Sequence, residues 1–274
     1  MVAMPDSSQT RFMVLHRGDA PLHPRPGTGE PPAVEEACPA PSVPRRVVTA
    51  HPVAGSGGRR WSVTGRTADD FYLIAHNERS GRCRVSPRRA GVAAAAGLLA
   101  ELMMAGHLRA VGRRVFPCPR DEPPADPLLR DVLESVYRAR SGLEVEHWLV
   151  ALRPHALRDV RDRLVASGVL TEVVTRRWFG PRRSTFVPTD PGAPGCVRSR
   201  LANGLSAGAP MPPEDLVLTG LAEVTGLLET VVPLRLDDDP GTARAAERRR
   251  ELPVQLRELV VSAYTAVGSG PPGG

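Results

Sequence analysis

Apolar residues recur along most of this chain at intervals of three and four positions, which is the spacing of one face of an α-helix. The clearest example lies between Leu128 and Val136, and another lies between Leu98 and Met103. The same spacing predicts about eight helices. They begin near residues 67 and 126, and the others lie near 86–105, 144–152, 154–167, 194–205, 213–228 and 252–267.

Short motifs mark where several of these helices begin and end. Thr67 opens T-A-D-D, which has the composition of an N-cap and a first turn. Ser86 and Asp126 are each followed by proline, so both predict a cap with proline at the first helical position. Gly106 and Gly168 each follow a helical run, and we expect both to end a helix in a backbone conformation with positive φ.

Two segments predict small β-structures. Residues 108–116 alternate like a strand, and residues 81–85 predict a short strand after a turn. L-A-E-L-M-M-A-G-H-L and V-R-D-R-L-V-A-S-G-V-L both read as a helix, a glycine and the apolar start of a strand. With about eight helices and two β-ribbons, the fold class is mainly α, a multi-helix globular domain with a protruding β-hairpin.

The hairpin is the most informative part of the chain for function. It follows Gly168, and its tip is W-F-G-P at 178–181. Two exposed aromatic residues among four cations suit the boundary of an anionic lipid bilayer. We expect interfacial insertion, while a contact with a protein client or a second copy, or a packed aromatic corner, remains an alternative. The inserting set is Arg176, Arg177, Trp178, Phe179, Arg182 and Arg183.

Charge points to the same region. Residues 151–200 hold ten arginines and four acidic residues, an excess of six that equals the net charge of +6 of the whole chain. A local excess of one sign indicates an anionic partner such as phosphate, a lipid headgroup or nucleic acid. The chain contains no lysine and is rich in Ala, Pro, Gly and Arg, so a GC-rich genome is an alternative explanation.

Composition divides the chain into a folded part and two tails. The 29 prolines and 26 glycines are dense in residues 1–65 and after 267. We therefore expect a disordered tail at 1–65, a helical domain at 66–267 and a disordered tail at 268–274. The four cysteines have no metal-ligand spacing, and no apolar run approaches 18 residues. We expect free thiols in a reducing cytoplasm and only peripheral contact with a membrane.

Signs of catalysis are lacking in the sequence. The seven histidines form no H-E-x-x-H motif, and there is no Walker loop and no G-x-S-x-G. Asp237, Asp238 and Asp239 precede Pro240, and we interpret them as a loop that enters a helix rather than as a magnesium site. We therefore expect no enzyme activity, no catalytic residue, no metal and no cofactor.

Four segments in order resemble a known family. They are V-S-P-R-R-A-G at 85–91, L-L-A-E-L-M-M-A-G-H-L at 98–108, D-P-L-L-R-D-V-L at 126–133 and L-R-D-V-R-D-R-L-V-A-S-G-V-L at 157–170. Together they resemble the Golgi phosphoprotein 3 family (GPP34 domain), in a bacterial, actinobacterial-looking branch, over about 67–267. The resemblance implies a mostly helical domain with a protruding hairpin and a peripheral membrane protein, since the eukaryotic members of the family bind phosphatidylinositol 4-phosphate and gather glycosyltransferase tails.

The resemblance also implies a headgroup pocket. Its two arginines on the later helix correspond to Arg158 and Arg161, whereas its tryptophan and its earlier arginine correspond to Ser86 and Ala95. Half of that pocket is therefore missing, so the identity of the lipid does not carry over. Arg88 and Arg89 lie nearby in the sequence and are candidates to supply the missing charge.

Helical geometry places Arg161 within the apolar arc of its helix and Arg158 at the edge of that arc. Asp162 lies four positions after Arg158, and Asp159 lies four positions before Arg163, so local ion pairs are available to these two arginines. Arg161 has no acid at such spacings. Because a buried unpaired charge is costly, Arg161 requires a distant carboxylate or a ligand.

These features predict a cytoplasmic, membrane-associated adaptor that binds an anionic phospholipid or phosphoinositide headgroup. A winged-helix DNA-binding regulator is the alternative, since a helix, G-V-L and a basic hairpin are also typical of a recognition helix and its wing. Asp159 and Asp162 on the outward face would repel DNA phosphates, and the helix offers no Asn or Gln to read bases. We therefore do not expect nucleic acid as a partner.

Overall fold

The computed structural model describes residues 65–139, 142–175, 183–206, 210–231 and 241–268. The predicted tails fall outside these ranges except for Gly65 and Gly268, and so does the tip of the hairpin. The elements in chain order are α1 (Thr67–Ala75), α2 (Pro87–Met104), β1 (Leu108–Val111), β2 (Arg114–Pro117), α3 (Pro127–Arg138), β3 (Leu143–Glu144), α4 (Val145–Ala166), β4 (Leu170–Thr175), β5 (Arg183–Pro188), α5 (Ala193–Ser206), α6 (Pro213–Thr225), α7 (Leu228–Val231), α8 (Gly241–Arg249) and α9 (Val254–Gly268). The mainly α fold class with a β-hairpin is confirmed.

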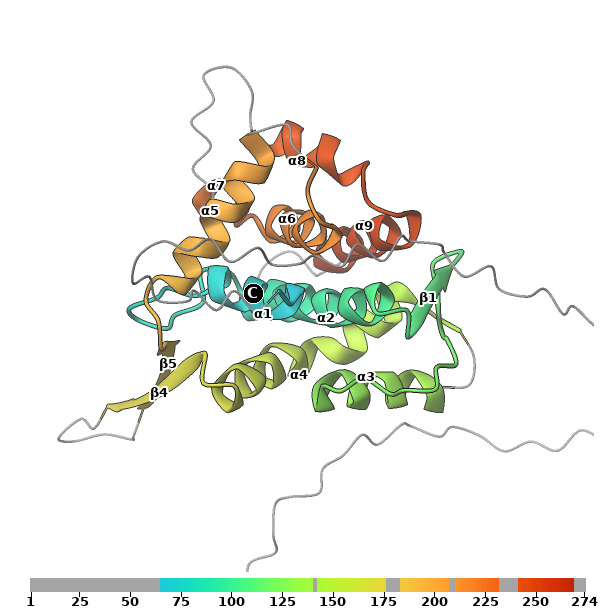
Figure 1. The fold of residues 1–274 in the computed structure, drawn as a ribbon, viewed down its shortest axis with the longest axis horizontal. Helices are drawn as coiled ribbons and strands as arrows, with labels where there is room; N and C mark the ends of the chain where they lie inside the picture. Colours follow the sequence, from blue (N-terminus) through green and yellow to red (C-terminus); the bar gives the residue numbers. More distant parts are fainter. Residues whose placement is uncertain (1–64, 140–141, 176–182, 207–209, 232–240, 269–274) are drawn as a thin grey trace, which may run out of the picture. The chain divides into compact units, whose positions relative to one another are not determined.

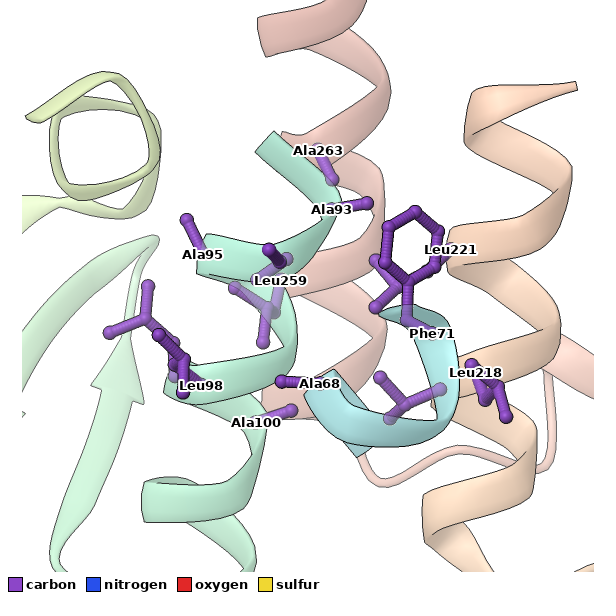
Figure 2. Close-up of a cluster of buried hydrophobic side chains, with 14 of the residues drawn as sticks. Ala68, Phe71, Ala93, Ala95, Leu98, Ala100, Leu218, Leu221, Leu259 and Ala263 are labelled. Carbon is purple, nitrogen blue, oxygen red and sulfur yellow. The ribbon is translucent and has the colours of Figure 1, made fainter. Parts of the chain in front are cut away.

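Helix α2 is the centre of the fold. It packs against α1, α3, α4, α6 and α9, and in Figure 1 it lies between a layer that holds α3 and α4 and a layer that holds α6 and α9. Four successive alanines, Ala93–Ala96, and Gly97 are all buried within it. Such small side chains let the surrounding helices approach closely, and the larger residues come from those neighbours. Figure 2 shows Phe71 of α1 and Leu218 and Leu221 of α6 in one buried cluster with residues of α2.

The predicted caps of α2 and α3 are confirmed. The side chain of Ser86 accepts a hydrogen bond from the backbone N–H of Arg89, and Asp126 accepts from Leu128 and Leu129. Proline occupies the first turn of both helices. Thr67 differs from the prediction, because Arg66 is the N-cap residue of α1 and Thr67 is its first helical residue.

Gly106 and Gly168 end their helices as the repeated pattern predicts. Their φ angles are +73° and +74°, and each carries the paired hydrogen bonds of a Schellman motif. After Gly106 the N–H of His107 donates to the carbonyl of Leu102, and after Gly168 the N–H of Val169 donates to the carbonyl of Leu164. A two-stranded antiparallel pairing follows each motif, β1 with β2 and β4 with β5.

Several predicted elements require correction. The strand expected at 108–116 is two strands, because Gly112 and Arg113 both adopt positive φ and form a tight hairpin turn. The strand expected at 81–85 is only an isolated bridge between His76 and Cys83. The helix expected at 213–228 ends at Thr225, and α7 and α8 were not predicted. The low apolar content of α8 explains why periodicity missed it.

The two helices predicted at 144–152 and 154–167 are one helix, α4, with Pro154 inside it. Proline normally interrupts a helix because it lacks an N–H and its ring crowds the preceding turn. Here the side chains of Leu149, Leu152, Ala156 and Val160 are buried on both sides of the proline. The burial of this continuous face outweighs the loss of one backbone hydrogen bond.

Candidate functional site

The end of α4 leads directly into an uncovered β-ribbon. Strands β4 and β5 pair from Leu170 opposite Pro188 to Thr175 opposite Arg183, and no third strand joins them in the described part of the chain. Residues 171–174 are exposed on both faces of the ribbon, and Val173 and Val174 are 44% and 54% exposed. In Figure 1 the ribbon extends away from the helices. The predicted protruding hairpin is therefore confirmed.

The tip of this hairpin lies outside the described residues. Five members of the predicted inserting set belong to this stretch: Arg176, Arg177, Trp178, Phe179 and Arg182. Arg183 is the first residue of β5, and its backbone pairs with Thr175. The structure therefore establishes the stem that carries these residues, and their role in binding stays a prediction.

A turn over residues 77–82 packs against the base of the ribbon. The side chain of Asn77 accepts hydrogen bonds from the backbone N–H groups of Arg79 and Ser80, which closes the turn. Gly81 has φ of +62°, and a Cβ atom there would lie 2.5 Å from the carbonyl oxygen of Phe186. Only glycine permits this approach, so the turn and β5 are held in direct backbone contact.

Arg161 lies at the junction between α4 and β5. Its Nε and Nη2 atoms donate to Oδ1 of Asp162 at 2.9 and 2.8 Å. Its Cζ atom lies 4.4 Å from the centre of the Phe186 ring, within the range of a cation–π contact. The guanidinium therefore contacts both a carboxylate, that of Asp162, and an aromatic ring, that of Phe186. The ion pair corrects the expectation that only a distant carboxylate or a ligand would satisfy Arg161.

Tyr72 and His76 of the adjoining segment support this junction. Their rings stack with centroids 3.9 Å apart, and Nδ1 of His76 lies 2.8 Å from the carbonyl oxygen of Tyr72. Burial raises the pKa of Tyr72 to about 12, although the nearby Arg161 acts in the opposite direction. Burial also lowers the pKa of His76. Both side chains are therefore neutral near pH 7, and the cations that act on them are Arg161 at Tyr72 and Arg84 at His76.

Arg158 has the same kind of local partner but, within the described ranges, no cation–π contact. Its Nε and Nη2 atoms both donate to Oδ1 of Asp159 at 3.2 Å, and its side chain is 58% exposed. The predicted pair between Arg158 and Asp162 is wrong, because Asp162 pairs with Arg161. Both arginines thus lie at the surface and are balanced by the aspartate that follows each of them in the sequence.

The buried arginine of α4 is Arg163. Its side chain is only 9% exposed and forms ion pairs with Asp69, Glu101 and Asp126 from three other elements. The predicted pair with Asp159 is therefore wrong. The buried positions of α4 run from Val145 to Leu164, and the arc through all of them is centred close to Arg163 rather than Arg161. The arc predicted from the last two turns alone was therefore misplaced.

This buried cluster connects four helices. Glu101 of α2 also accepts a hydrogen bond from the N–H of Ala68 in α1, and Asp126 also pairs with Arg66. Burial raises the pKa of Asp69 to about 6 and raises that of Glu101, while Arg163 opposes both shifts. Because Arg163 is satisfied from within the fold, we assign the cluster to stability. The sequence does contain a signal for this cluster, because Glu101 lies within the apolar run L-L-A-E-L-M-M and a buried acid requires a cation.

Arg88 and Arg89, the other candidates for headgroup binding, lie at the start of α2 and have different neighbours from Arg158 and Arg161. Nη2 of Arg88 donates to the carbonyl oxygen of Ala266 in α9 at 3.4 Å, whereas Arg89 is exposed. No hydrogen bond or ion pair among the described residues joins either of them to Arg158 or Arg161. Ala95 is fully buried in the core, so this position contributes nothing to a surface pocket.

The described part of the chain contains no cluster of His, Cys, Asp and Glu suited to a metal ion. Within the same residues, no helix is long and apolar enough to cross a membrane. No curated protein matches this chain. Residues 68–264 match the protein family described as Golgi phosphoprotein 3 (GPP34), and this match spans most of the chain. The chain therefore belongs to the Golgi phosphoprotein 3 family, as the four ordered motifs of its sequence predicted.

Proposed function

We propose that this chain is a peripheral membrane adaptor without catalytic activity, which contacts anionic phospholipid headgroups through the end of α4 and the hairpin that follows it. The observation that carries the proposal is the β4–β5 ribbon, whose residues 171–174 are exposed on both faces. An isolated two-stranded ribbon is rarely stable alone in water. A ribbon that extends from the helical domain therefore suggests a role in binding rather than in stability. Membership of the family is consistent with this role.

The sequence at the tip suits a lipid surface. Four arginines near an anionic membrane contribute roughly 1 kcal/mol each. The partial burial of Trp178 and Phe179 would add about 3–5 kcal/mol at roughly 25 cal/mol per Å². Since the ordering of the tip offsets part of this sum, one hairpin gives reversible binding. A second contact or a second copy of the chain would make the binding firmer.

Arg158 and Arg161 are the proposed headgroup contacts. Exposed ion pairs contribute only about 0–1 kcal/mol, so a phosphate group can replace a neighbouring aspartate at little cost. An arginine also binds phosphate through two parallel N–H groups, which suits both side chains. Arg88 and Arg89 stay candidates for a separate contact. Ser86 and the buried Ala95 at the other two pocket positions leave the kind of phospholipid open.

Charge on α4 argues against DNA as the partner. The two carboxylates on its outer side, Asp159 and Asp162, already balance Arg158 and Arg161. A recognition helix also needs side chains that read base edges, and apart from arginine α4 offers no Asn or Gln for this purpose. The exposed side chains of Val173 and Val174 are also more suited to lipid or protein than to a phosphate backbone.

Sedimentation with phosphatidylcholine vesicles that contain phosphatidylserine tests the proposal. We expect W178A/F179A and R158A/R161A each to bind at least tenfold more weakly than the parent. The matched control is R114A/R138A, which removes two exposed arginines from β2 and α3 and should lose much less affinity. Equal binding by the parent and W178A/F179A would refute the lipid role. In that case, a shift of duplex DNA at moderate salt would favour nucleic acid instead.

A further inference from the structure

We infer that Arg161 is a positioning residue, which sets the direction in which the β4–β5 ribbon leaves the helical body by holding the ring of Phe186. The inference deepens the proposed function, because it assigns to one residue the control of where the hairpin tip lies. Arg161 then has a role that Arg158 does not share, although the two arginines lie one turn apart on the same helix.

The contacts of Arg161 show how it holds the ring. Both donors on one edge of the guanidinium go to a single oxygen of Asp162, which fixes the orientation of its plane. The Cζ atom of the same group lies over the ring of Phe186, 4.4 Å from its centre. Because the ion pair already fixes the orientation of the guanidinium, its contact with an aromatic ring costs little further entropy.

Phe186 is also restrained from the backbone side. Its carbonyl oxygen lies 2.5 Å from the position that a Cβ atom of Gly81 would occupy, so the 77–82 turn touches the strand at this residue. Its backbone pairs with Glu172 across the ribbon. The strand is therefore held at Phe186 by the turn, which meets its backbone, and by Arg161, which meets its ring. In contrast, Val173 and Val174, which lie further toward the tip, are exposed.

The angle of the ribbon at Phe186 controls the position of everything that the ribbon carries. Phe186 lies three residues from Arg183, where β5 begins, which is roughly 10 Å of strand, so a rotation of about 20° at Phe186 would displace that end of the ribbon by roughly 3–4 Å. Interfacial side chains reach only about 5–10 Å into the boundary between headgroups and acyl chains. A displacement of a few ångströms is a large part of that depth, so a change of angle at Phe186 would weaken insertion of the segment that β4 and β5 carry.

Arg158 provides a matched comparison. It forms the same ion pair with the aspartate that follows it, on the same helix, but it has no aromatic contact among the described residues. If both arginines act only as charges, R158A and R161A will have equal effects. If Arg161 acts through Phe186, then R161A and F186L will share an effect that R158A lacks, even though F186L removes no charge.

Hydrogen–deuterium exchange of the full chain in solution tests the positioning role without any membrane. We expect R161A and F186L to speed exchange of the amides in β4 and β5 by about three- to fivefold, which corresponds to the loss of a cation–π contact. R158A should leave these rates unchanged, and F186Y, which keeps the aromatic face, should restore them. Amides of α2 serve as the internal reference for global stability. Unchanged ribbon exchange in both R161A and F186L would overturn the inference.

Binding to the phosphatidylserine vesicles then separates this inference from the proposed function. We expect F186L to bind about threefold or more weakly than both the parent and F186Y. We also expect R161A to lose more affinity than R158A. Vesicle binding that falls for W178A/F179A but not for F186L would leave the lipid role standing and overturn the positioning role. Binding that is insensitive to W178A/F179A would end the lipid role, while ribbon exchange would still decide whether Arg161 holds the hairpin.

Discussion

Arg163 of α4 donates from Nε and Nη2 to the same oxygen of Asp69 in α1, at 2.8 and 2.6 Å. The two residues are 94 positions apart in the sequence. Both side chains are almost completely buried, and the Nη1 atom of Arg163 also reaches Glu101 and Asp126. One guanidinium thus binds carboxylates that belong to α1, α2 and the cap of α3.

We predict that Arg163→Met lowers the free energy of unfolding by about 3–5 kcal/mol, because it leaves the buried carboxylates without their shared cation. Urea unfolding at pH 7 measures this loss. Arg158→Met on the same helix removes an exposed ion pair and should change the value by no more than about 0.5 kcal/mol. Similar values for the two variants would show that the buried cluster is not important for stability.

The raised pKa of Asp69 should be visible in the pH dependence of the free energy of unfolding. Its pKa of about 6 exceeds the ordinary value of 3.8, so the folded protein retains this proton where the unfolded chain has released it. Stability falls with rising pH wherever the folded state binds more protons, here between about pH 4 and 6. Arg163, Glu101 and Arg66 act on the same carboxylate, and Asp126 pairs with both of these arginines. The raised pKa of Glu101 acts in the same direction.

Asp69→Asn should remove that contribution. From pH 4 to 6, the free energy of unfolding of D69N should rise relative to the parent by on the order of 2 kcal/mol, and the difference should be constant above about pH 6. Urea titrations of both proteins across this range provide the measurement. A difference that does not vary with pH would mean that Asp69 ionises at its ordinary pKa in the folded state.

Gly81→Ala should destabilise the protein more than Gly168→Ala. Both glycines have positive φ, but nothing lies within 4 Å of a Cβ atom at Gly168. The backbone strain of roughly 1–2 kcal/mol applies to both variants. The clash of the new methyl group with Phe186 adds about 1–3 kcal/mol at Gly81 alone. Thermal unfolding of the two variants compares the costs, and equal costs would mean that the 77–82 turn does not press on β5.

Gly97→Ala should reverse the usual effect of this substitution in a helix. Alanine normally stabilises a helix interior by about 1 kcal/mol relative to glycine. At Gly97, however, the new Cβ atom would lie 2.9–3.0 Å from backbone and side-chain atoms of Ala68, and we expect a net loss of about 1–3 kcal/mol. Gly195→Ala in α5 is the control, since its nearest neighbour is 4.0 Å away. Stabilisation by both substitutions would show that α1 can move away from α2 without cost.

Local sequence was enough to predict several features correctly. The caps at Ser86 and Asp126 and the stops at Gly106 and Gly168 depend on hydrogen bonds that reach only a few residues along the chain. The hairpin after Gly168 and the ordered motifs of the family are also local patterns. The elements predicted less well, such as 108–116, depend on the backbone angles of one or two residues, which periodicity does not report.

The sequence by itself determined the mainly helical fold, the family and the segment that carries the excess of positive charge. Only the tertiary structure decided which arginine of α4 faces the interior and which lies against the ribbon. Burial depends on the neighbours that surround a helix, and the acids that neutralise Arg163 lie as far as 62 and 94 positions away in the chain. Arg161 and Phe186 likewise meet because α4, the 77–82 turn and β5 pack together, which the spacing of residues along one helix does not encode.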